Sequence, residues 1–284
     1  MLTAALIDPI VRAALAEDAP WGDLTCATVL PPSATATAEL VARTGGVLAG
    51  GQVLAAAFTL TDPAVQVTLM TADGEQFVAG DTLARVQGPA AAVLQAERIA
   101  LNFTQRLSAI ATTTSRYVAA VAGTGVRIAD TRKTTPGLRV LEHHAVRAGG
   151  GHNHRFGLSD AVMLKDNHLA VLTAAGLDVT EALRKARRRL GHTVHLEVEV
   201  DRLDQIEAVL AAGVDTIMLD NFSLEQLRQG VALIDGRAIV EASGNVSLDT
   251  VADIAGTGVD VISVGALTHS VAALDLGLDV QVSA

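Results

Sequence analysis

The stretch VHLEVEVDRLDQIEAVLAAGVDTIMLD, residues 194–220, shows the pattern that decides the fold. It begins with a Val-rich strand pattern, continues with a helical pattern from Arg202 to Gly213, and ends in a second apolar strand that stops at Asp220. Strand, helix and strand in this order are typical of a parallel sheet that is covered by helices. The same order repeats on both sides of this stretch.

Six strand candidates follow one another after Gly125, and loops and helical patterns separate them. They are VRIAD (126–130), AVMLKD (161–166), VHLEVEV (194–200), TIMLD (216–220), AIVEAS (238–243) and VISVG (261–265). Each candidate ends at or beside a polar residue or a glycine. In a β/α barrel the carboxyl ends of all strands meet at one mouth, whereas an open doubly wound sheet uses only those at its switch point. Structural capping explains one or two such endings but not six, so we predict an α/β fold with an incomplete or irregular β/α barrel of about six strands.

The residues before Gly125 follow a different pattern, which indicates an α+β domain with an open sheet. Strand-like runs divided by Gly, Asp and Pro turns lie between Thr35 and Gly88, namely TATAELVAR, VLAGG, VQVTLM and TLARVQG. A long helical pattern follows Pro89. A short opening helix is expected to start at Pro9, with Asp8 as its N-cap.

These patterns place the division between the two domains near residue 110. We predict an N-terminal α+β domain at residues 1–110 and a catalytic β/α barrel at residues 111–269. The C-terminal tail, residues 270–284, is expected to pack on the first domain.

Composition limits the class of protein. The chain has 284 residues and 50% hydrophobic content, enough for one large domain or two ordinary ones. Its one cysteine, Cys26, excludes an internal disulfide framework and fits a reducing compartment. The net charge of −10 argues against general nucleic-acid binding, and the N-terminus lacks the basic start of a signal peptide. No apolar run is long enough to cross a bilayer. We expect a cytoplasmic protein that binds neither nucleic acid nor membrane.

Residues 130–168, DTRKTTPGLRVLEHHAVRAGGGHNHRFGLSDAVMLKDNH, gather cations in this acidic chain. Guanidinium groups suit carboxylates and phosphates, and lysine supplies a compact positive charge. We therefore predict an anion site here, although the cations could instead be surface charges that answer acidic residues elsewhere. The six cations are Arg132, Lys133, Arg139, Arg147, Arg155 and Lys165. A second basic run, residues 184–189, falls in a helical pattern and is expected to be a solvated helix face.

Two carboxylates and two glycine turns share the predicted mouth. Glu199 and Asp220 can hydrogen-bond sugar hydroxyls or help to hold Mg²⁺ through oxygen ligands and water. The turns SGN (243–245) and GAL (265–267) precede helical runs, where backbone N–H groups can bind a phosphate. A zinc site at His152 and His154 is the alternative, but Arg155 beside them repels a cation and no cysteine is near. His154 is better suited as a hydrogen-bond donor to an anionic ligand. The predicted ligands are a phosphorylated sugar and a small multi-carboxylate molecule, with or without a divalent metal, a combination that describes phosphoribosyl transfer to an acidic base.

Six segments in this order resemble the quinolinate phosphoribosyltransferase family: DTRKTTPGLR, RAGGGHNHRFGLSD, KDNH, EVEVD, LDNF and SVGALTHS. The resemblance extends from EDAPWGDLT through ERIALN to the C-terminal tail. One of these segments alone would be a weak signal, but six in order are specific. The resemblance implies that quinolinate and phosphoribosyl pyrophosphate give nicotinate mononucleotide, pyrophosphate and CO₂, with Mg²⁺, in NAD biosynthesis.

The resemblance also implies a role for each residue of the mouth. Quinolinate would bind Arg98, Thr131, Arg132, His154, Arg155 and Lys165. The catalytic residues would be Lys133, Lys165, Glu199 and Asp220. Of these, the lysines would face the departing pyrophosphate, and the carboxylates would face the ribose hydroxyls and the metal, directly or through water. The 5′-phosphate would bind Ser243, Gly244, Asn245, Val264, Gly265 and Ala266.

The resemblance further implies an assembly of subunits. The family places the arginine that matches Arg98 in the active site of a neighbouring subunit, which implies a homodimer or a larger assembly. An ion pair on a helix surface is the alternative for Arg98. The chain departs from the family at Ala109, where glycine is usual, and at His143 and His144, which replace a tyrosine-containing segment and are expected on a helix face.

Four other functions compete with this one. A nicotinate-specific phosphoribosyltransferase would need fewer cations, and a molybdenum-transport paralogue of the same fold is expected to lack the DTRKT and KDNH segments. An aldolase with Lys165 as its Schiff-base lysine would need a pocket that favours the neutral amine. A non-enzymatic phosphosugar-binding module would leave the two carboxylates of the mouth unexplained.

Overall fold

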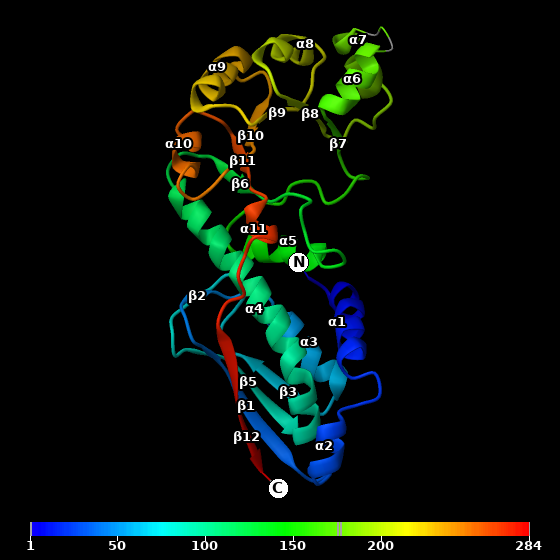
Figure 1. The fold of residues 1–284 in the computed structure, drawn as a ribbon, viewed down its shortest axis with the longest axis vertical. Helices are drawn as coiled ribbons and strands as arrows, with labels where there is room; N and C mark the ends of the chain where they lie inside the picture. Colours follow the sequence, from blue (N-terminus) through cyan, green and yellow to red (C-terminus); the bar gives the residue numbers. More distant parts are fainter. Residues whose placement is uncertain (1, 175, 177, 284) are drawn as a thin grey trace. The chain divides into compact units, whose positions relative to one another are not determined.

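The computed structural model describes residues 2–174, 176 and 178–283, which form two compact units. The first unit combines the chain up to Ser115 with residues 134–150 and the residues from Leu267 onward. The second unit combines residues 116–133 with residues 151–266. The predicted boundary near residue 110 falls inside a single helix, α4 (Ala90–Ala120), which is the long helix expected after Pro89 (Figure 1).

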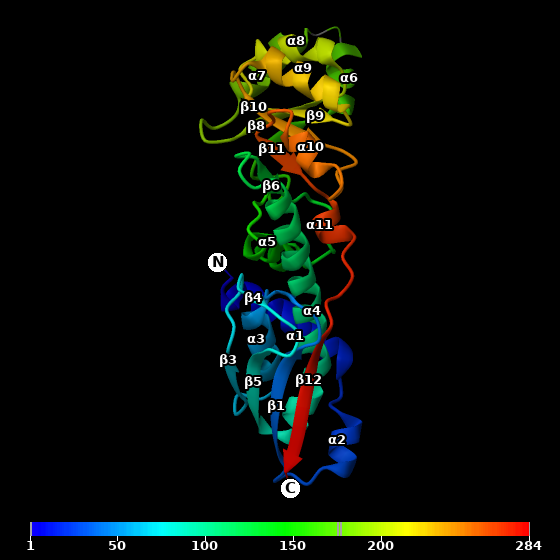
Figure 2. The same cartoon turned by 90° about the vertical axis from the view of Figure 1, so that its left-hand side faces the viewer.

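The first unit contains a four-stranded antiparallel sheet whose order is β12-β1-β5-β3. The C-terminal strand β12 pairs with β1 from Thr35↔Ser283 to Ala42↔Leu276, so the tail supplies an edge strand to this sheet (Figure 2). On β1 the residues Ala36, Ala38, Leu40 and Ala42 are buried and alternate with more exposed ones. This alternation leaves one face of the sheet open to water. The strands of this unit are β1 (Thr35–Ala42), β2 (Gly46–Val47), β3 (Gln66–Leu69), β4 (Gln76–Phe77), β5 (Thr82–Pro89) and β12 (Leu276–Ser283).

One helix of the first unit, α3 (Gly51–Thr61), corrects the expectation of strands alone between Thr35 and Gly88. Its first amides, Gly50 N and Gly51 N, donate to the carboxylate of Asp73 at 3.0 and 2.9 Å. This cap comes from 22 residues further along the chain, so no capping signal stands next to the helix. The buried face of α3 consists of Gly51, Val53, Leu54, Ala57 and Phe58.

The first helix also differs from its predicted bounds. α1 spans Ala4–Asp18, and Thr3 occupies its N-cap position. Pro9 therefore lies inside the helix, and Asp8 is a helical residue rather than the N-cap. A second short helix, α2 (Leu24–Val29), is capped by the Asp23 side chain, which accepts from Cys26 N at 3.0 Å.

The second unit contains the six parallel strands that the sequence predicts, in the order β6-β11-β10-β9-β8-β7. The first of these strands thus pairs with the last, as in a barrel, but within the described residues no pairing joins β6 to β7. The barrel is therefore incomplete, and its helices cover the outer side of the strands (Figure 1). The strands are β6 (Arg127–Ala129), β7 (Val162–Leu164), β8 (Leu196–Val200), β9 (Thr216–Asp220), β10 (Ile239–Ser243) and β11 (Val261–Ser263). The helices between them are α6 (Asp166–Ala174), α7 (Val179–Arg187), η1 (Leu203–Gln205), α8 (Ile206–Leu210), α9 (Leu224–Ile234) and α10 (Val251–Ala255).

Residues 134–150 belong to the first unit because helix α5 (Arg139–Ala148) is tied to α4. Glu142 of α5 is fully buried, and Arg106 of α4 donates to its Oε1 atom at 2.8 Å. Arg106 also donates to Thr135 Oγ1 at 2.8 Å and to the carbonyl oxygen of Thr268 at 2.9 Å. The amide of Thr135 completes the network with a bond to Glu142 Oε2 at 3.1 Å. This network fixes the chain directly after the DTRK segment.

Replacing Glu142 by Ala should lower the free energy of unfolding by about 3 kcal/mol, because Arg106 then keeps a half-buried charge without its carboxylate. Urea denaturation followed by circular dichroism measures this change. Glu39→Ala serves as the control, since Glu39 pairs with Arg85 on the exposed face of the sheet and such pairs contribute little. Equal, small losses in the two variants would contradict the structural role of Glu142.

Candidate active site

Polar side chains follow the parallel strands at their carboxyl ends, as the sequence predicts. Asp220 of β9 stands opposite Ser243 of β10 in the register, and Glu199 of β8 stands opposite Met218 of β9. Because side chains alternate between the two faces of a strand, Met218 and Asp220 share one face. Glu199, Asp220 and Ser243 therefore lie on the same face of the sheet, at the end that we call the mouth.

Lys165, directly after β7, extends the row of mouth residues. Its Nζ atom forms an ion pair with Glu199 Oε2 at 2.5 Å, and its amide donates to His168 Nδ1 at 2.9 Å. Lys165 is exposed, whereas the side chain of Glu199 is 13% exposed. The pair places a cation and a carboxylate side by side at neighbouring strand ends, where an anionic substrate and a ribose can meet them.

Asn221 connects the ends of β9 and β10. Its Nδ2 atom donates to Asp220 Oδ2 at 2.7 Å, and its Oδ1 atom accepts from Asn245 Nδ2 at 3.1 Å. Gly244 lies so close that a Cβ atom there would be 2.2 Å from Asn221 Oδ1, and its φ of +93° favours glycine. The SGN turn is thus packed against Asn221, which in turn donates to the carboxylate of Asp220.

The two glycine turns differ from the expected helix N-termini. Five residues lie between Asn245 and the start of α10 at Val251, so no helix begins directly after the SGN turn. At the GAL turn, α11 (Ala266–His269) begins at once but has four residues. Val264 N donates to the Ala129 carbonyl at 2.9 Å, which fixes this turn beside β6. Any phosphate at these turns would depend on local N–H groups more than on a long helix.

The DTRK segment follows β6 and joins the exposed rim of the mouth. Thr131 Oγ1 accepts the amide of Lys133 at 3.1 Å, which forms a local turn. Arg132 and Lys133 are exposed, whereas Asp130 is fully buried. Asp130 Oδ1 accepts the amide of His154 at 2.8 Å, and Asn153 Nδ2 donates to Asp130 Oδ2. Asp130 therefore ties the DTRK segment to the segment around His154.

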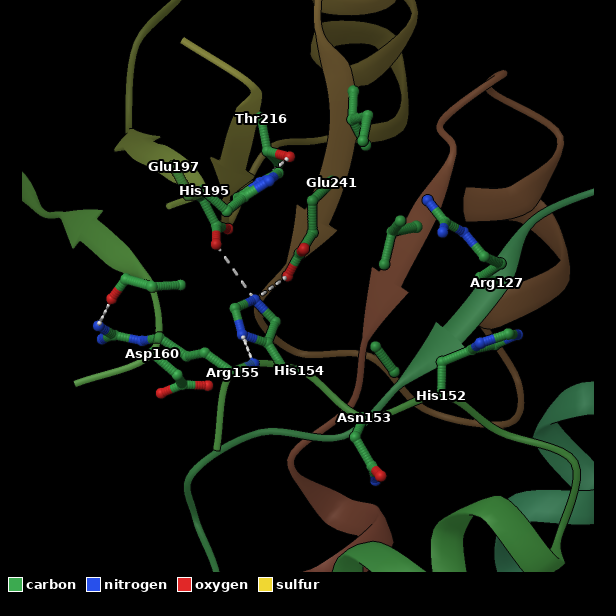
Figure 3. A pocket seen from close by; sticks show the side chains of 14 residues that line it. Arg127, His152, Asn153, His154, Arg155, Asp160, His195, Glu197, Thr216 and Glu241 are labelled. Atoms are coloured by element: carbon green, nitrogen blue, oxygen red, sulfur yellow. Dashed lines mark hydrogen bonds and ion pairs between the residues drawn. The ribbon is translucent and has the colours of Figure 1, made fainter. Parts of the chain in front are cut away.

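His154 lies between two buried carboxylates that the sequence analysis does not single out (Figure 3). Its Nε2 atom is 3.3 Å from Glu197 Oε2 and 3.4 Å from Glu241 Oε1. Glu197 and Glu241 are each 4% exposed. Burial alone would lower the pKa of His154, but the two carboxylates outweigh it and raise this pKa to about 10. Burial also raises the pKa of Glu197, and the neighbouring Glu241 raises it further.

The hydrogen on His154 Nε2 decides whether this cluster can hold a metal. The three residues are the one group of metal-ligating side chains found among the described residues. However, the Arg155 amide donates to His154 Nδ1 at 2.7 Å, so a neutral ring carries its hydrogen on Nε2. An imidazolium carries hydrogen there as well, and a nitrogen that bears hydrogen is not a metal ligand. His152 is not part of this group, and its side chain points away from His154 (Figure 3).

Arg155 lies next to His154 and lines the same cavity of about 350 Å³. Its guanidinium donates to the Ala161 carbonyl at 3.3 Å and contacts Met163 Sδ at 3.6 Å. Burial and the nearby charge of Arg132 both lower the pKa of Arg155, whereas Glu197 raises it. The charge of Arg132 is thus near enough to act on Arg155, and two neighbouring guanidinium groups suit a ligand with more than one negative charge.

The structure brings most of the predicted residues together in the second unit, in two groups. The mouth holds Lys165, Glu199, Asp220, Ser243, Gly244 and Asn245, and the second group holds Arg132, His154 and Arg155. Arg98 lies on α4 in the first unit and is exposed. Of the departures from the family, Ala109 and His143 are buried, and His144 Nε2 pairs with Asp73 Oδ2 at 2.6 Å.

The sequence contains a signal for Glu197 and Glu241 in the alternation of residues along their strands. In LEVEV the residues alternate, so Glu197 must share a face with Glu199, and in IVEAS Glu241 must share a face with Ser243. Period-two alternation therefore indicates two layers of polar groups on this face, the mouth and a layer below it.

Two family models match the chain. The N-terminal domain of quinolinate phosphoribosyl transferase matches residues 23–108, and the C-terminal domain matches residues 110–279. Among the described residues, no helix is both long and apolar enough to cross a membrane.

Similar curated proteins carry one type of name. A probable nicotinate-nucleotide pyrophosphorylase (carboxylating) of Bacillus subtilis is 45% identical over 267 residues, which are 94% of this chain and 91% of that protein. The nicotinate-nucleotide pyrophosphorylase (carboxylating) of Mycobacterium leprae is 44% identical over 278 residues, with 95% of each chain covered.

Solved structures agree with these matches. NadC from Streptococcus pyogenes superposes with a TM-score of 0.93 at 42% identity and covers 100% of this chain and 98% of its own. The nicotinate-nucleotide pyrophosphorylase of Francisella tularensis has a TM-score of 0.91 at 37% identity, with coverage of 99% and 98%. A human nicotinic acid phosphoribosyltransferase, at 15% identity and a TM-score of 0.57, shares the fold alone.

Proposed function

The chain belongs to the quinolinate phosphoribosyl transferase family, and from this premise we propose that its mouth residues carry out the family's reaction. The enzyme transfers phosphoribosyl from phosphoribosyl pyrophosphate to quinolinate with decarboxylation, and gives nicotinate mononucleotide, pyrophosphate and CO₂ for NAD biosynthesis. The observation that supports these residues most is the Lys165–Glu199 pair, which joins a cation to the carboxylate row at the ends of adjacent parallel strands.

Quinolinate has two carboxylates, and the chain offers cations in two places to bind them. Burial and the nearby charge of Arg132 lower the pKa of Arg155, and Lys165 directly follows β7 and pairs with Glu199. Arginine forks bind carboxylates through paired hydrogen bonds. In this proposal Arg132, Arg155 and Lys165, with Thr131, bind the pyridine acid, His154 lies beside Arg155 with both ring nitrogens facing protein groups, and Arg98 joins the site from a second subunit.

The carboxylates of the mouth serve the ribose. Glu199 and Asp220 accept hydrogen bonds from its hydroxyls, and the turns at 243–245 and 264–266 bind the 5′-phosphate through backbone N–H groups. The same two carboxylates present hard oxygen ligands, which suit Mg²⁺, directly or through water. Mg²⁺ bound there would neutralise part of the negative charge of the pyrophosphate.

Electrostatics and positioning account for the chemistry at this site. As pyrophosphate leaves, positive charge develops at the ribose carbon, and a fixed carboxylate nearby stabilises it. Lys133 and Lys165 face the negative charge that gathers on the leaving pyrophosphate. After transfer, loss of CO₂ leaves an electron pair on the ring carbon beside the cationic ring nitrogen, whose charge stabilises that pair, and a proton from solvent then adds to this carbon. The protein's contribution to that step is to hold the ring in place and away from water.

An assay for CO₂ release tests the reaction directly. Quinolinate labelled in its 2-carboxylate should release labelled CO₂ only when phosphoribosyl pyrophosphate is present, and nicotinate mononucleotide should form in equal amount. CO₂ release without phosphoribosyl pyrophosphate, or no release at all, would contradict the proposed function.

The competing functions lack matching observations. Lys165 lies against Glu199 rather than in the apolar pocket that a Schiff-base lysine needs, which argues against an aldolase. The DTRKT and KDNH segments are intact, contrary to the molybdenum-transport paralogue. A nicotinate-specific enzyme would leave the Arg132–Arg155 pair with one carboxylate to bind. A binding module would not need a carboxylate row at the mouth.

We also propose that the enzyme works as a homodimer or a larger assembly in the cytoplasm. The exposed position of Arg98 on α4 supports a role at a subunit contact, since an exposed arginine is free to enter another subunit's site. The lone, buried and unpaired Cys26 fits a reducing compartment.

Mixing Arg98→Ala chains with Lys165→Ala chains should restore activity that neither variant has alone. Each hybrid dimer holds one site with both residues intact, so random reassembly should return about a quarter of wild-type activity. The measurement is turnover after unfolding and refolding the mixture, with each variant refolded alone as the control. A verified hybrid dimer that stays inactive would show that the site is not shared.

A further inference from the structure

Glu197 and Glu241 are two buried carboxylates for which the proposed reaction has no use. They come from β8 and β10, the two strands on either side of β9, and both line the cavity that His154 and Arg155 enter (Figure 3). Two such groups in one interior repel each other and are costly to bury without a partner. The cost of burying these two carboxylates suggests that they have a function in the protein.

Among the described residues, both carboxylates form an ion pair with the same atom, Nε2 of His154. Glu197 Oε1 and Glu241 Oε1 accept no hydrogen bond from any described residue, and both carboxylates meet His154 as ion pairs. His154 in turn is held at three points. Its amide donates to Asp130, its Nδ1 atom accepts from the Arg155 amide, and its Nε2 atom faces the two carboxylates. All the polar atoms of the ring are therefore engaged by the protein.

The contact at Nδ1 links the ring of His154 to the arginine beside it. Because the Arg155 amide points at Nδ1, the position of the ring determines the direction of the chain at Arg155. The Arg155 guanidinium then reaches Ala161 and Met163 beside and within β7. We propose that Glu197 and Glu241 are positioning residues, which hold the ring of His154 and thereby place Arg155 to bind a carboxylate of the pyridine substrate.

This proposal deepens the proposed function and rests on it, but the holding contact itself does not depend on catalysis. It also holds in either protonation state of His154, because the neutral tautomer that accepts from Arg155 and the imidazolium both carry hydrogen on Nε2. The task of the carboxylates is to face that N–H group with their oxygens, which lie 3.3 Å (Glu197 Oε2) and 3.4 Å (Glu241 Oε1) from Nε2. A neutral acceptor of the same shape should therefore replace them.

Two double variants show whether His154 needs the oxygen atoms of residues 197 and 241 or their negative charge. The melting temperature of each variant shows whether the pair instead stabilises the fold. Glu197→Leu with Glu241→Leu removes both acceptors, and the KM for quinolinate should rise by about 10-fold or more. The KM for phosphoribosyl pyrophosphate should stay within about twofold, and the melting temperature should not fall, because hydrophobic residues often replace buried ionic clusters without loss. Glu197→Gln with Glu241→Gln keeps two amide oxygens as acceptors and should restore the KM for quinolinate. His195→Gln is the control, since His195 lines the same cavity but bonds to Thr216.

Nitrogen NMR of the histidine rings supplies a readout that does not depend on turnover. In the wild type and the Gln variant, His154 should show a slowly exchanging hydrogen on Nε2, and this signal should be lost in the Leu variant. If the double Leu variant does not fold, the single variants Glu197→Leu and Glu241→Leu should each give a smaller rise in the KM for quinolinate.

Each other outcome overturns the proposal. An unchanged KM for quinolinate in the Leu variants would show that the pair does not position Arg155. Equal damage in the Gln and Leu variants would show that charge, not the held ring, is required. A loss of melting temperature with unchanged KM would make the pair structural. Failure of the proposed function is distinct, because wild-type enzyme would then form no nicotinate mononucleotide while the His154 signal would still report the contact.

Discussion

Replacing Asp220 by Asn should lower kcat by about 10²-fold, which is the usual effect of losing one electrostatic stabiliser of a transition state. Asp220 is the last residue of β9 and lies on the same face of the sheet as Glu199 and Ser243. The side-chain Nδ2 atom of Asn221 donates to its carboxylate and orients it. The Asn side chain has nearly the same shape but no charge to oppose the cationic ribose carbon. The melting temperature should stay close to that of the wild type, since Asp220 lies at the rim of the sheet and not in its core. Steady-state kinetics and thermal unfolding of the same preparation measure the two effects.

The same strand offers a matched control at its other end. Asp215 precedes β9, accepts from Arg187 at 2.6 and 2.8 Å, and accepts the amide of Leu196 at 2.7 Å. Asp215→Asn should lower the melting temperature and leave kcat unchanged, the reverse of Asp220→Asn. A strong loss of stability in Asp220→Asn with intact specific activity would make Asp220 a structural residue.

The sequence predicts the second unit well because its strands carry their own signals. Each strand is a short apolar run that ends in a polar residue, and a parallel arrangement brings those ends to one edge. Glu199, Asp220 and Ser243 follow from this rule without any knowledge of the contacts. The prediction of an incomplete barrel also follows, because six strands are too few for the usual eight.

Contacts between distant residues explain what the sequence does not predict. The cap of α3 comes from Asp73, and Asp73 is itself held by His144, which lies 71 residues further on. Residues 134–150 join the first unit through the buried contact between Arg106 and Glu142, although the sequence places them in the barrel. No local pattern encodes these pairings, since each requires two segments that meet only in the folded chain.

The enzyme should prefer quinolinate over nicotinate by at least about 10³-fold in kcat/KM, or about 4 kcal/mol. The physical reason is the number of cations. Burial and the nearby charge of Arg132 both lower the pKa of Arg155, and a ligand with one carboxylate offsets less of this local positive charge than a ligand with two. A site built for two anionic groups penalises a ligand that lacks one. Parallel assays with the two acids at saturating phosphoribosyl pyrophosphate give the ratio.

Arg155→Ala should narrow this preference, because the loss of one cation harms the dicarboxylate more than the monocarboxylate. Arg127→Ala is the matched control, since Arg127 lines the same cavity from β6 and has no assigned role in binding the substrate. The control should keep the wild-type ratio of the two kcat/KM values. Comparable values for quinolinate and nicotinate in the wild type would instead favour a nicotinate-specific enzyme. A ratio that falls equally in both variants would show that the total positive charge of the cavity, rather than the placement of Arg155, selects the second carboxylate.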